Sequence, residues 1–294
     1  MTDDFPAGSV VVGTDGSANA EVAVDWAAEE AERRGVGLHI LYAFPWISRA
    51  RAWEFAPPAD AESRGAELVR AAAERVRAAH PDLSVTTEAR VEDPAIALVS
   101  ASTRAGLVVV GRRGLGGAEE LLLGSVSHKV AAHARSAVAV VNARPSAGAA
   151  APVVVGMDPE EGAPEAVEYA FEEARRRGTR VVVVQGAQHD AAFPDFPDTG
   201  ITEYYEKAAG EAARLTAERL AEWRQRFPDV EAELRLMRER PVRALVRAAE
   251  EAGVVVVGSR GRGGLTSMLL GSVSHGVANQ APVVVIVRAG VEAT

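Results

Sequence analysis

Two stretches of the chain combine residue types and a spacing that suit the binding of an anion such as phosphate. Each has two glycines three positions apart, nine further residues, and a third glycine followed by Ser-Val-Ser, and matched positions differ by 147 residues. The first joins Gly111-Arg112-Arg113-Gly114 to Gly124-Ser125-Val126-Ser127, and the second joins Gly258-Ser259-Arg260-Gly261 to Gly271-Ser272-Val273-Ser274. Each follows an aliphatic run, so the pattern predicts a strand, a loop and a helix in that order.

The chemistry expected of these stretches is recognition of phosphate oxygens. Glycine has no Cβ, so its backbone can come close to a phosphate and point successive N–H groups at it. A helix that begins at the serines adds hydroxyl donors, first-turn amides and the positive end of the helix dipole. Arginines add charge-assisted hydrogen bonds. The arginines and further glycines of the two loops are Arg112, Arg113, Gly116, Gly117, Arg260, Arg262, Gly263 and Gly264.

Two simpler interpretations compete with an anion site. Glycine-rich loops are often only tight turns, and Ser125 and Ser272 can be only helix caps. Two copies with the same spacing, each after an apolar run, favour the anion site. The pattern differs from a Walker loop, because neither Lys129 nor Lys207 follows such a glycine. It also lacks the G-x-G-x-x-G order of a dinucleotide-binding loop.

Apolar runs of strand length alternate with amphipathic stretches of helical length. This order predicts α/β domains in which helices cover both faces of a parallel sheet. Expected strands are Val10 to Gly13, Leu38 to Ala43, Leu83 to Ala89, Leu107 to Val110, Ala137 to Val141, Val153 to Met157, Val181 to Gln185, Val230 to Met237, Val254 to Val257 and Val283 to Val287. Expected helices of the first half are Glu21 to Arg34, Ala61 to Ala79, Ala95 to Thr103 and Val126 to Ala134. The fourth strand of each half lacks polar alternation, so we expect it to be buried on both faces.

The repeat and the length of 294 residues predict two domains. We expect the first at residues 1–144 and the second at residues 153–294, joined by a linker of small residues at 145–152. Longer loops with proline and glycine, at Pro45 to Pro58 and Ala187 to Gly200, are candidate lids or exposed connections.

The composition excludes several classes of function. A net charge of −9 disfavours nucleic acid and anionic membranes as partners. The absence of cysteine excludes disulfides, thiolate chemistry and the thiolate ligands of a zinc site. Residues 1–8 lack an apolar signal core and no apolar run is long enough to span a membrane, so we expect a cytoplasmic protein.

Both glycine stretches match the motif G-x2-G-x9-G-(S/T), and through them the chain resembles a tandem member of the universal stress protein family over nearly its whole length. The opening segment Val12-Gly13-Thr14-Asp15-Gly16-Ser17 and its counterpart Val155-Gly156-Met157-Asp158 extend the resemblance. It implies two tandem Rossmann-like domains, similar to adenine nucleotide alpha hydrolases, each with a five-stranded parallel sheet flanked by helices. It also implies ATP, with any Mg²⁺ brought by the nucleotide.

The resemblance also implies roles for single residues. Asp15 and Asp158 would lie near the adenosine, and Ala43 and Gly186 would meet the adenine edge through their backbone. The glycine loops and the Ser-Val-Ser segments would hold ribose and phosphates. The full set of implied ligand-binding residues is Gly13, Asp15, Ala43, Gly111, Arg112, Arg113, Gly114, Gly116, Gly117, Gly124, Ser125, Val126, Ser127, Gly156, Asp158, Gly186, Gly258, Ser259, Arg260, Gly261, Gly263, Gly264, Gly271, Ser272, Val273 and Ser274.

The second copy departs from the first after its opening strand. Where the first half has Gly16-Ser17, the second has Pro159-Glu160-Glu161, whose carboxylates would lie close to the path of a triphosphate. We therefore expect a weaker or altered second site. A structural alternative is a capping box in Asp158-Pro159-Glu160-Glu161, with proline at the first helical position. Asp15 has a similar alternative as a cap of the next helix.

The family resemblance implies a non-enzymatic, nucleotide-dependent regulator of the stress response. Slow ATP hydrolysis and a scaffold with empty sites are the alternatives, and hydrolysis is disfavoured because no positioned base or lysine accompanies the loops.

His128 and His275 share one repeat position, and we expect them to be surface or packing residues rather than catalytic. His128 and His133 are five residues apart, which does not suit a helical metal pair. Family members pair through their last strands, so the resemblance predicts that the two halves pair with each other. We also expect a homodimer and, separately, an unknown protein partner.

Overall fold

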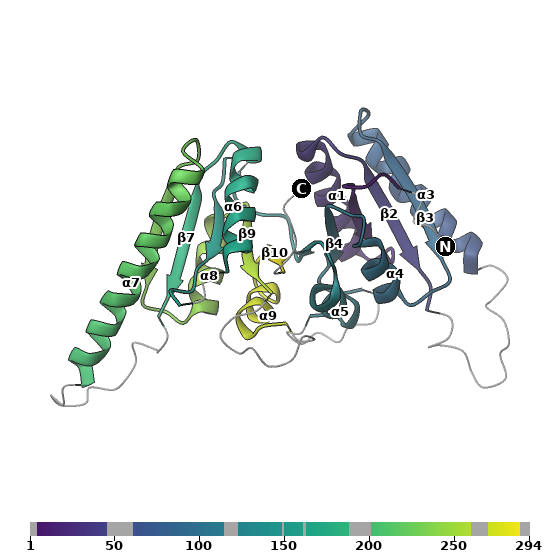
Figure 1. The fold of residues 1–294 in the computed structure, drawn as a ribbon. Coiled ribbons are helices and arrows are strands. Elements are labelled where there is room, and N and C mark those ends of the chain that lie inside the picture. The colour runs from purple at the N-terminus through teal and green to yellow at the C-terminus, as the bar shows by residue number, and fades with distance from the viewer. Residues whose placement is uncertain are drawn as a thin grey trace. The chain divides into compact units, whose positions relative to one another are not determined.

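The computed structural model describes residues 5–45, 61–114, 123–148, 150–160, 163–187, 201–259 and 270–288. Within them the chain forms two α/β units, one holding strands β1 to β5 and the other β6 to β10 (Figure 1). The predicted class, two tandem Rossmann-like domains with parallel sheets, is confirmed. The domain limits and the linker stay predictions. The two predicted long loops lie outside the described residues except at Pro45 and Ala187.

The sheet of the first unit is parallel, with the order β3-β2-β1-β4-β5. Its strands are β1 (Val10–Gly13), β2 (Leu38–Ala43), β3 (Val85–Arg90), β4 (Leu107–Gly111) and β5 (Ala137–Val141). Val12 of β1 is in register with Val109 of β4, so the two strands end at the same edge of the sheet. β4 is buried from Leu107 to Val110, as expected of a strand covered on both faces.

Four helices of the first unit are described, and they form two layers. They are α1 (Ala18–Arg34), α3 (Ala61–Ala79), α4 (Pro94–Ala101) and α5 (Ser125–His133). α1 and α3 pack on one face of the sheet, and α4 and α5 pack on the other. α1 ends at Gly35, whose positive φ of 64° favours glycine because a Cβ would be strained there.

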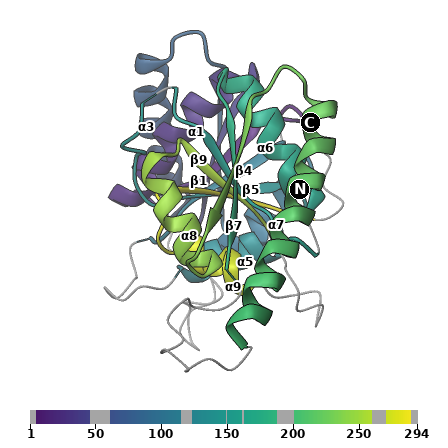
Figure 2. The same cartoon turned by 90° about the vertical axis from the view of Figure 1, so that its left-hand side faces the viewer.

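The second unit repeats this plan with the order β10-β9-β6-β7-β8, again parallel. Its strands are β6 (Val153–Gly156), β7 (Val181–Gly186), β8 (Ala232–Met237), β9 (Val254–Gly258) and β10 (Val283–Val287). Its helices are α6 (Pro164–Arg177), α7 (Ile201–Arg226), α8 (Pro241–Ala248), the 3-10 turn η1 (Ala249–Glu251) and α9 (Ser272–Ala278). Figure 2 shows α7 and α8 on opposite sides of these strands.

Two strands begin later than the sequence predicts. β3 starts at Val85 rather than Leu83, and β8 starts at Ala232 rather than Val230. The reason is local, because each of the earlier residues still belongs to a turn. Leu83 N–H donates to His80 (3.2 Å) and Val230 N–H donates to Phe227 (3.1 Å), so neither is available to the sheet.

Among the described helices, none is long and apolar enough to cross a membrane.

Candidate anion-binding site

The carboxyl ends of β1 and β4 bring the predicted residues of the first unit to one edge of the sheet. Ligands of open parallel sheets bind at this edge. The segment after β1 contains Asp15, and the segment after β4 contains Arg112, Arg113 and Gly114. The sheet register therefore places next to each other two segments that are almost 100 residues apart in the chain.

Asp15 shapes the turn after β1 without capping the following helix. Its Oδ1 accepts a hydrogen bond from the N–H of Ser17 (3.0 Å), and the hydroxyl oxygen of Ser17 accepts one from the N–H of Ala20 (3.2 Å). Ser17 is thus the N-cap of α1, and the interpretation of Asp15 as the cap is wrong. Gly16, with a φ of +76°, turns the chain between them. The Asp15 side chain is half-buried at the sheet edge.

The glycines of the first loop allow segments of the protein to approach one another closely. A Cβ built on Gly114 would overlap Oδ2 of Asp15. One on Gly111 would lie 3.1 Å from the carbonyl oxygen of Asn19, and one on Gly124 would lie 2.9 Å from that of Arg112. The sequence predicts these glycines as room for a phosphate. The structure gives a second reason for glycine at these positions, because a side chain there would collide with a neighbouring segment of the protein.

The start of α5 differs from one sequence-based interpretation of its serines, that of a helix cap. The N-cap is Gly124, which has no side chain, so the interpretation of Ser125 as a cap is wrong. Ser127 is 4% exposed and donates its hydroxyl hydrogen to the carbonyl oxygen of Gly111 (2.7 Å), and its contact with a phosphate stays a prediction. The N–H groups of Ser125, Val126 and Ser127 have no acceptor among the described residues, as expected of an uncapped first turn.

Positive charge gathers beside this open helix start. Burial lowers the pKa of the Arg112 guanidinium, and the neighbouring charge of Arg113 lowers it further. Two adjacent cations repel each other, and an anion placed near both would relieve that repulsion. The N-terminal end of α5 adds the positive end of its dipole. Arg112, Arg113 and the start of α5 therefore contribute positive charge at an edge that also carries the Asp15 carboxylate.

In the second unit the same backbone hydrogen bond closes the loop after β9, and the helix that follows, α9, is shorter than α5. Gly271 N–H donates to the carbonyl of Ser259 (2.9 Å), as Gly124 N–H does to that of Arg112 (2.9 Å). Ser274 is buried and donates its hydroxyl hydrogen to the carbonyl oxygen of Gly258, and its contact with phosphate stays a prediction. Gly271 is the N-cap, so Ser272 is not the cap; Ser272 is exposed and Val273 is half-buried. Several predicted residues lie outside the described residues: Gly116, Gly117, Glu161, Arg260, Gly261, Arg262, Gly263 and Gly264.

The segment after β6 differs most from its counterpart in the first unit. Oδ1 of Asp158 accepts from the N–H of Glu160 (2.8 Å), and α6 begins only at Pro164, so the capping-box interpretation is wrong. Arg219 of α7 donates to the carbonyl oxygens of Asp158 (3.2 Å) and Glu160 (2.8 Å). Sequence reasoning missed Arg219, because no local pattern connects it with a turn about 60 residues earlier.

The remaining predicted residues lie at the ends of strands and contact neighbouring helices. A Cβ on Gly13 would lie 2.8 Å from Leu98, and one on Gly156 would lie 3.1 Å from Leu245, so both glycines make room for a helix. One on Gly186 would lie 2.6 Å from the Cα of Pro241. Ala43 is the last residue of β2. The N–H of Phe44, which follows it, donates to the carbonyl oxygen of Arg90 at the end of β3 (2.8 Å).

The two histidines at matched positions occupy the first turn of their helices. His128 N–H and His275 N–H donate to the carbonyls of Gly124 and Gly271, both at 2.9 Å. Nδ1 of His275 lies 3.3 Å from the side-chain nitrogen of Asn279. Across the part of the chain that is described, no three His, Asp or Glu side chains gather as a metal site.

The hydroxyl of Ser127 is expected to stabilise the first unit. Ser127→Ala removes the hydrogen bond that ties α5 to the end of β4, so the free energy of unfolding should fall by about 1 kcal/mol. Ser125→Ala is the matched control, because this exposed side chain makes no hydrogen bond to the described residues. Urea unfolding measures both variants. Equal losses for the two would contradict the assigned role.

Comparison with known proteins places the chain in a family. The model of the universal stress protein family matches residues 7–142 and 151–288. A universal stress protein of Mycolicibacterium smegmatis is 37% identical over 289 residues, which cover 94% of this chain and 96% of that protein. The crystal structure of a universal stress protein from Archaeoglobus fulgidus has the same fold, with a TM-score of 0.66, 20% identity, and coverage of 96% of this chain and 99% of that chain.

A crystal structure of a universal stress protein in complex with cAMP is 31% identical and covers 46% of this chain and 97% of its own, with a TM-score of 0.37. The repeated loop, the repeated order of strands and the two family matches agree. This chain belongs to the universal stress protein family and contains two tandem family domains.

Proposed function

We propose that the protein binds ATP at the carboxyl edge of its first unit and acts as a non-enzymatic regulator in the stress response. The observation that carries the proposal is that one loop after β4 meets two other segments: Gly114 lies against Asp15, and Arg112 accepts from Gly124 at the uncapped start of α5. The first-turn amides of α5 have no acceptor among the described residues. Family membership supports the stress context.

The residues present fit an adenine nucleotide. The amides of Ser125 and Val126 would hold phosphate oxygens, with Arg112 and Arg113 contributing positive charge. Asp15 would face the adenosine, and the backbone at Ala43 would meet the adenine edge. When bound, the nucleotide supplies a polyanionic phosphate chain, with Mg²⁺ as its counterion.

The second unit is proposed to bind nucleotide more weakly. Its turn after β6 is held by Arg219 and carries the Glu160 carboxylate where the first unit has the small Ser17. Negative charge close to a triphosphate is unfavourable. Its helix α9 also has only 7 residues, against 9 in α5.

Calorimetric titration of the full chain with Mg-ATP tests the proposal. We expect one saturable site per chain with higher affinity than any second site, and weaker binding of GTP, which presents a different base edge. Titrations with ADP and cAMP rank the adenine ligands. Absence of ATP binding, together with absence of co-purified adenine nucleotide in mass spectra of the native protein, would contradict the proposal and favour a scaffold.

A regulator should keep its nucleotide intact. Single-turnover assays at stoichiometric protein are expected to show no steady release of ADP. Steady release that is lost in Gly114→Ala would establish an ATPase instead. Regulation through assembly predicts a homodimer whose population depends on ATP in sedimentation experiments, and a monomer in both conditions would contradict that part of the proposal.

A further inference from the structure

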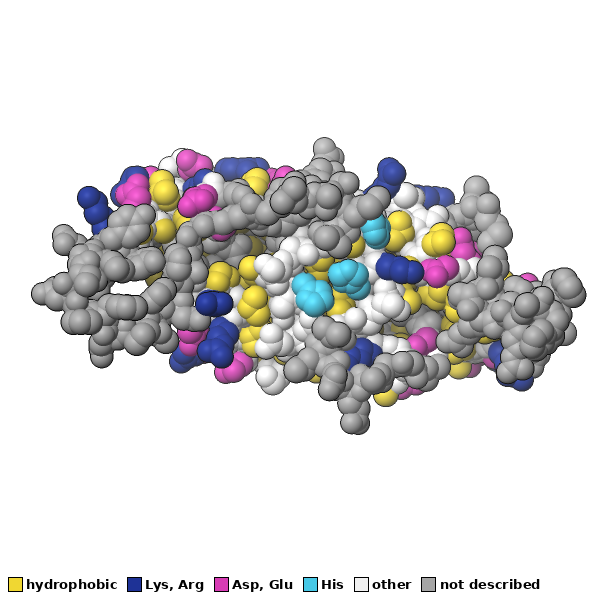
Figure 3. All heavy atoms as spheres, turned by 90° about the horizontal axis from the view of Figure 1, so that it is seen from below, with side chains coloured by type: hydrophobic (Ala, Val, Ile, Leu, Met, Phe, Trp, Pro, Cys, Tyr) yellow, Lys and Arg dark blue, Asp and Glu magenta, His cyan; other side chains and the backbone are white. Residues whose placement is uncertain are grey.

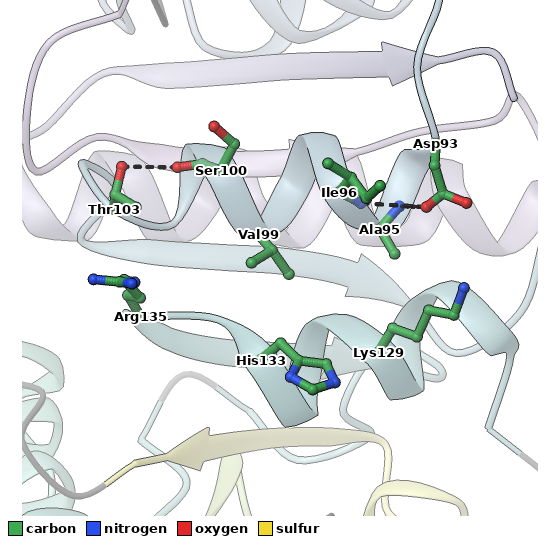
Figure 4. Close-up of a pocket in the computed structure, with 9 residues that line it drawn as sticks. All are labelled: Asp93, Ala95, Ile96, Val99, Ser100, Thr103, Lys129, His133 and Arg135. Carbon is green, nitrogen blue, oxygen red and sulfur yellow. Dashed lines mark hydrogen bonds between the residues drawn. The ribbon is translucent and has the colours of Figure 1, made fainter. Parts of the chain in front are cut away.

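A surface groove runs between α4 and α5 of the first unit, separate from the sheet edge described above. Its volume is about 480 Å³. Figure 4 shows Ala95, Ile96 and Val99 of α4 on one side, and Lys129 and His133 of α5 with the following Arg135 on the other. A groove between two helices, open along its length, suits an elongated ligand better than a compact one.

The α4 side of the groove is apolar. Ile96 is 60% exposed, which is unusual for a large aliphatic residue, and Val99 lies one helical turn further along the same face. Figure 3, the view from below, shows hydrophobic side chains beside those of lysine or arginine and of histidine on the face drawn. An apolar strip with a charged margin is characteristic of an interaction surface.

The α5 side of the groove is cationic. Lys129 and His133 are four residues apart and share one face of the helix. Among the described residues, the side chains of Lys129, His133 and Arg135 have no carboxylate partner. Asp93 lines the groove as well, but its Oδ1 already accepts from the N–H groups of Ala95 (2.9 Å) and Ile96 (3.3 Å).

The second unit shows that the fold does not require this groove. By the repeat of 147 residues, Arg243 replaces Ile96 and Gly276 replaces Lys129. Val242 packs where the groove would open, because a Cβ built on Gly276 would lie 2.9 Å from its methyl groups. The exposed isoleucine and the cationic margin are therefore particular to the first unit, and a general requirement of packing α4 on α5 does not explain them.

We propose that this groove binds an acidic amphipathic helix of a partner protein. Apolar side chains of that helix would pack on Ile96 and Val99, and its carboxylates would pair with Lys129 and Arg135. Charge complementarity favours an acidic partner at this place on a chain whose net charge is −9. α5 begins at the candidate nucleotide site and lines the groove further along, so one helix connects both surfaces.

Fluorescence anisotropy of the full chain tests the proposal. The probe is a fluorescein-labelled synthetic helical peptide with leucine at positions i, i+3, i+4 and i+7 and glutamate elsewhere. We expect saturable binding with a Kd of about 1–100 µM, and at least about tenfold weaker binding of a scrambled peptide and of a lysine-for-glutamate twin. Lys129→Glu and Ile96→Glu should each weaken binding at least about tenfold.

Arg243→Glu is the matched control. It changes the net charge as Lys129→Glu does, on the equivalent helix pair of the second unit, and should alter the Kd by less than about twofold. Equal binding of the scrambled peptide, or equal losses in both charge variants, would overturn the proposal. Binding of dodecanoate or of anionic lipid vesicles without binding of the peptide would also overturn it. No nucleotide is added, so the outcome does not depend on the proposed ATP site.

Discussion

Gly114→Ala is expected to weaken ATP binding by the first unit at least about tenfold, which corresponds to about 1.4 kcal/mol. The added Cβ would overlap Oδ2 of Asp15, whose other oxygen holds the N–H of Ser17. The carboxylate must therefore move, and the turn after β1 must move with it. Calorimetric titration with Mg-ATP measures the change.

The matched control is Gly210→Ala, since a Cβ at this glycine of α7 would contact nothing within 4 Å. Alanine is the better helix former, so this variant should be slightly more stable and bind ATP as before. Circular dichroism should show both variants folded, because Gly114 is exposed. Unchanged ATP affinity in folded Gly114→Ala would show that the contact with Asp15 does not shape the site.

Glu30→Gln and Glu173→Gln are expected to lower the free energy of unfolding by about 3 kcal/mol each. Glu30 is 1% exposed and accepts hydrogen bonds from Arg33 (2.8 Å) and Arg34 (2.7 Å). Glu173 is 2% exposed and is paired in the same way with Arg176 and Arg177. A neutral amide removes the buried negative charge that faces Arg34 and Arg177, whose side chains are 6% and 10% exposed. Urea denaturation should show a midpoint lower by about 1 M or more for the affected unit.

An exposed ion pair provides the control for these variants. Glu211 pairs with Arg214 at 2.6 Å, and both side chains are more than half exposed. Solvent screening makes such a pair worth little, so Glu211→Gln should change stability by less than about 1 kcal/mol. A chain with two units need not unfold in a single two-state step, so the transition of each unit is followed on its own. A loss in Glu30→Gln no larger than that in Glu211→Gln would contradict a stabilising role for the buried cluster.

Sequence reasoning was strongest for the elements and for the repeat. The bounds of β1, β2, β5 and β10 agree with the prediction, and α3 agrees at both ends. Runs of valine and helical stretches rich in alanine are local patterns, and local patterns are what periodicity detects. Errors gathered at the ends of elements, where turns compete with the strand for the same N–H groups.

Roles of single residues at the candidate site were harder to predict. Ser127 has the residue type of a phosphate ligand, yet it donates to Gly111 because α5 packs its first turn over the end of β4. Asp15 has the residue type of a helix cap, yet Ser17 takes that place. Residue type shows which hydrogen bonds a side chain can make. The partner that is in reach decides which one it makes.

The sequence by itself determined the two-fold repeat, the α/β class and the position of the glycine loops after aliphatic runs, since these follow from residue types and spacing along the chain. Its repeated motif also resembles that of the universal stress protein family. Tertiary structure alone decided that Gly114 meets Asp15, that Arg219 holds the turn after β6, and that a cationic groove opens beside Ile96 of the first unit. Each of these contacts joins residues far apart in the chain. They exist because sheet order and helix packing bring those residues together. A local pattern along the sequence does not predict contacts between such distant positions.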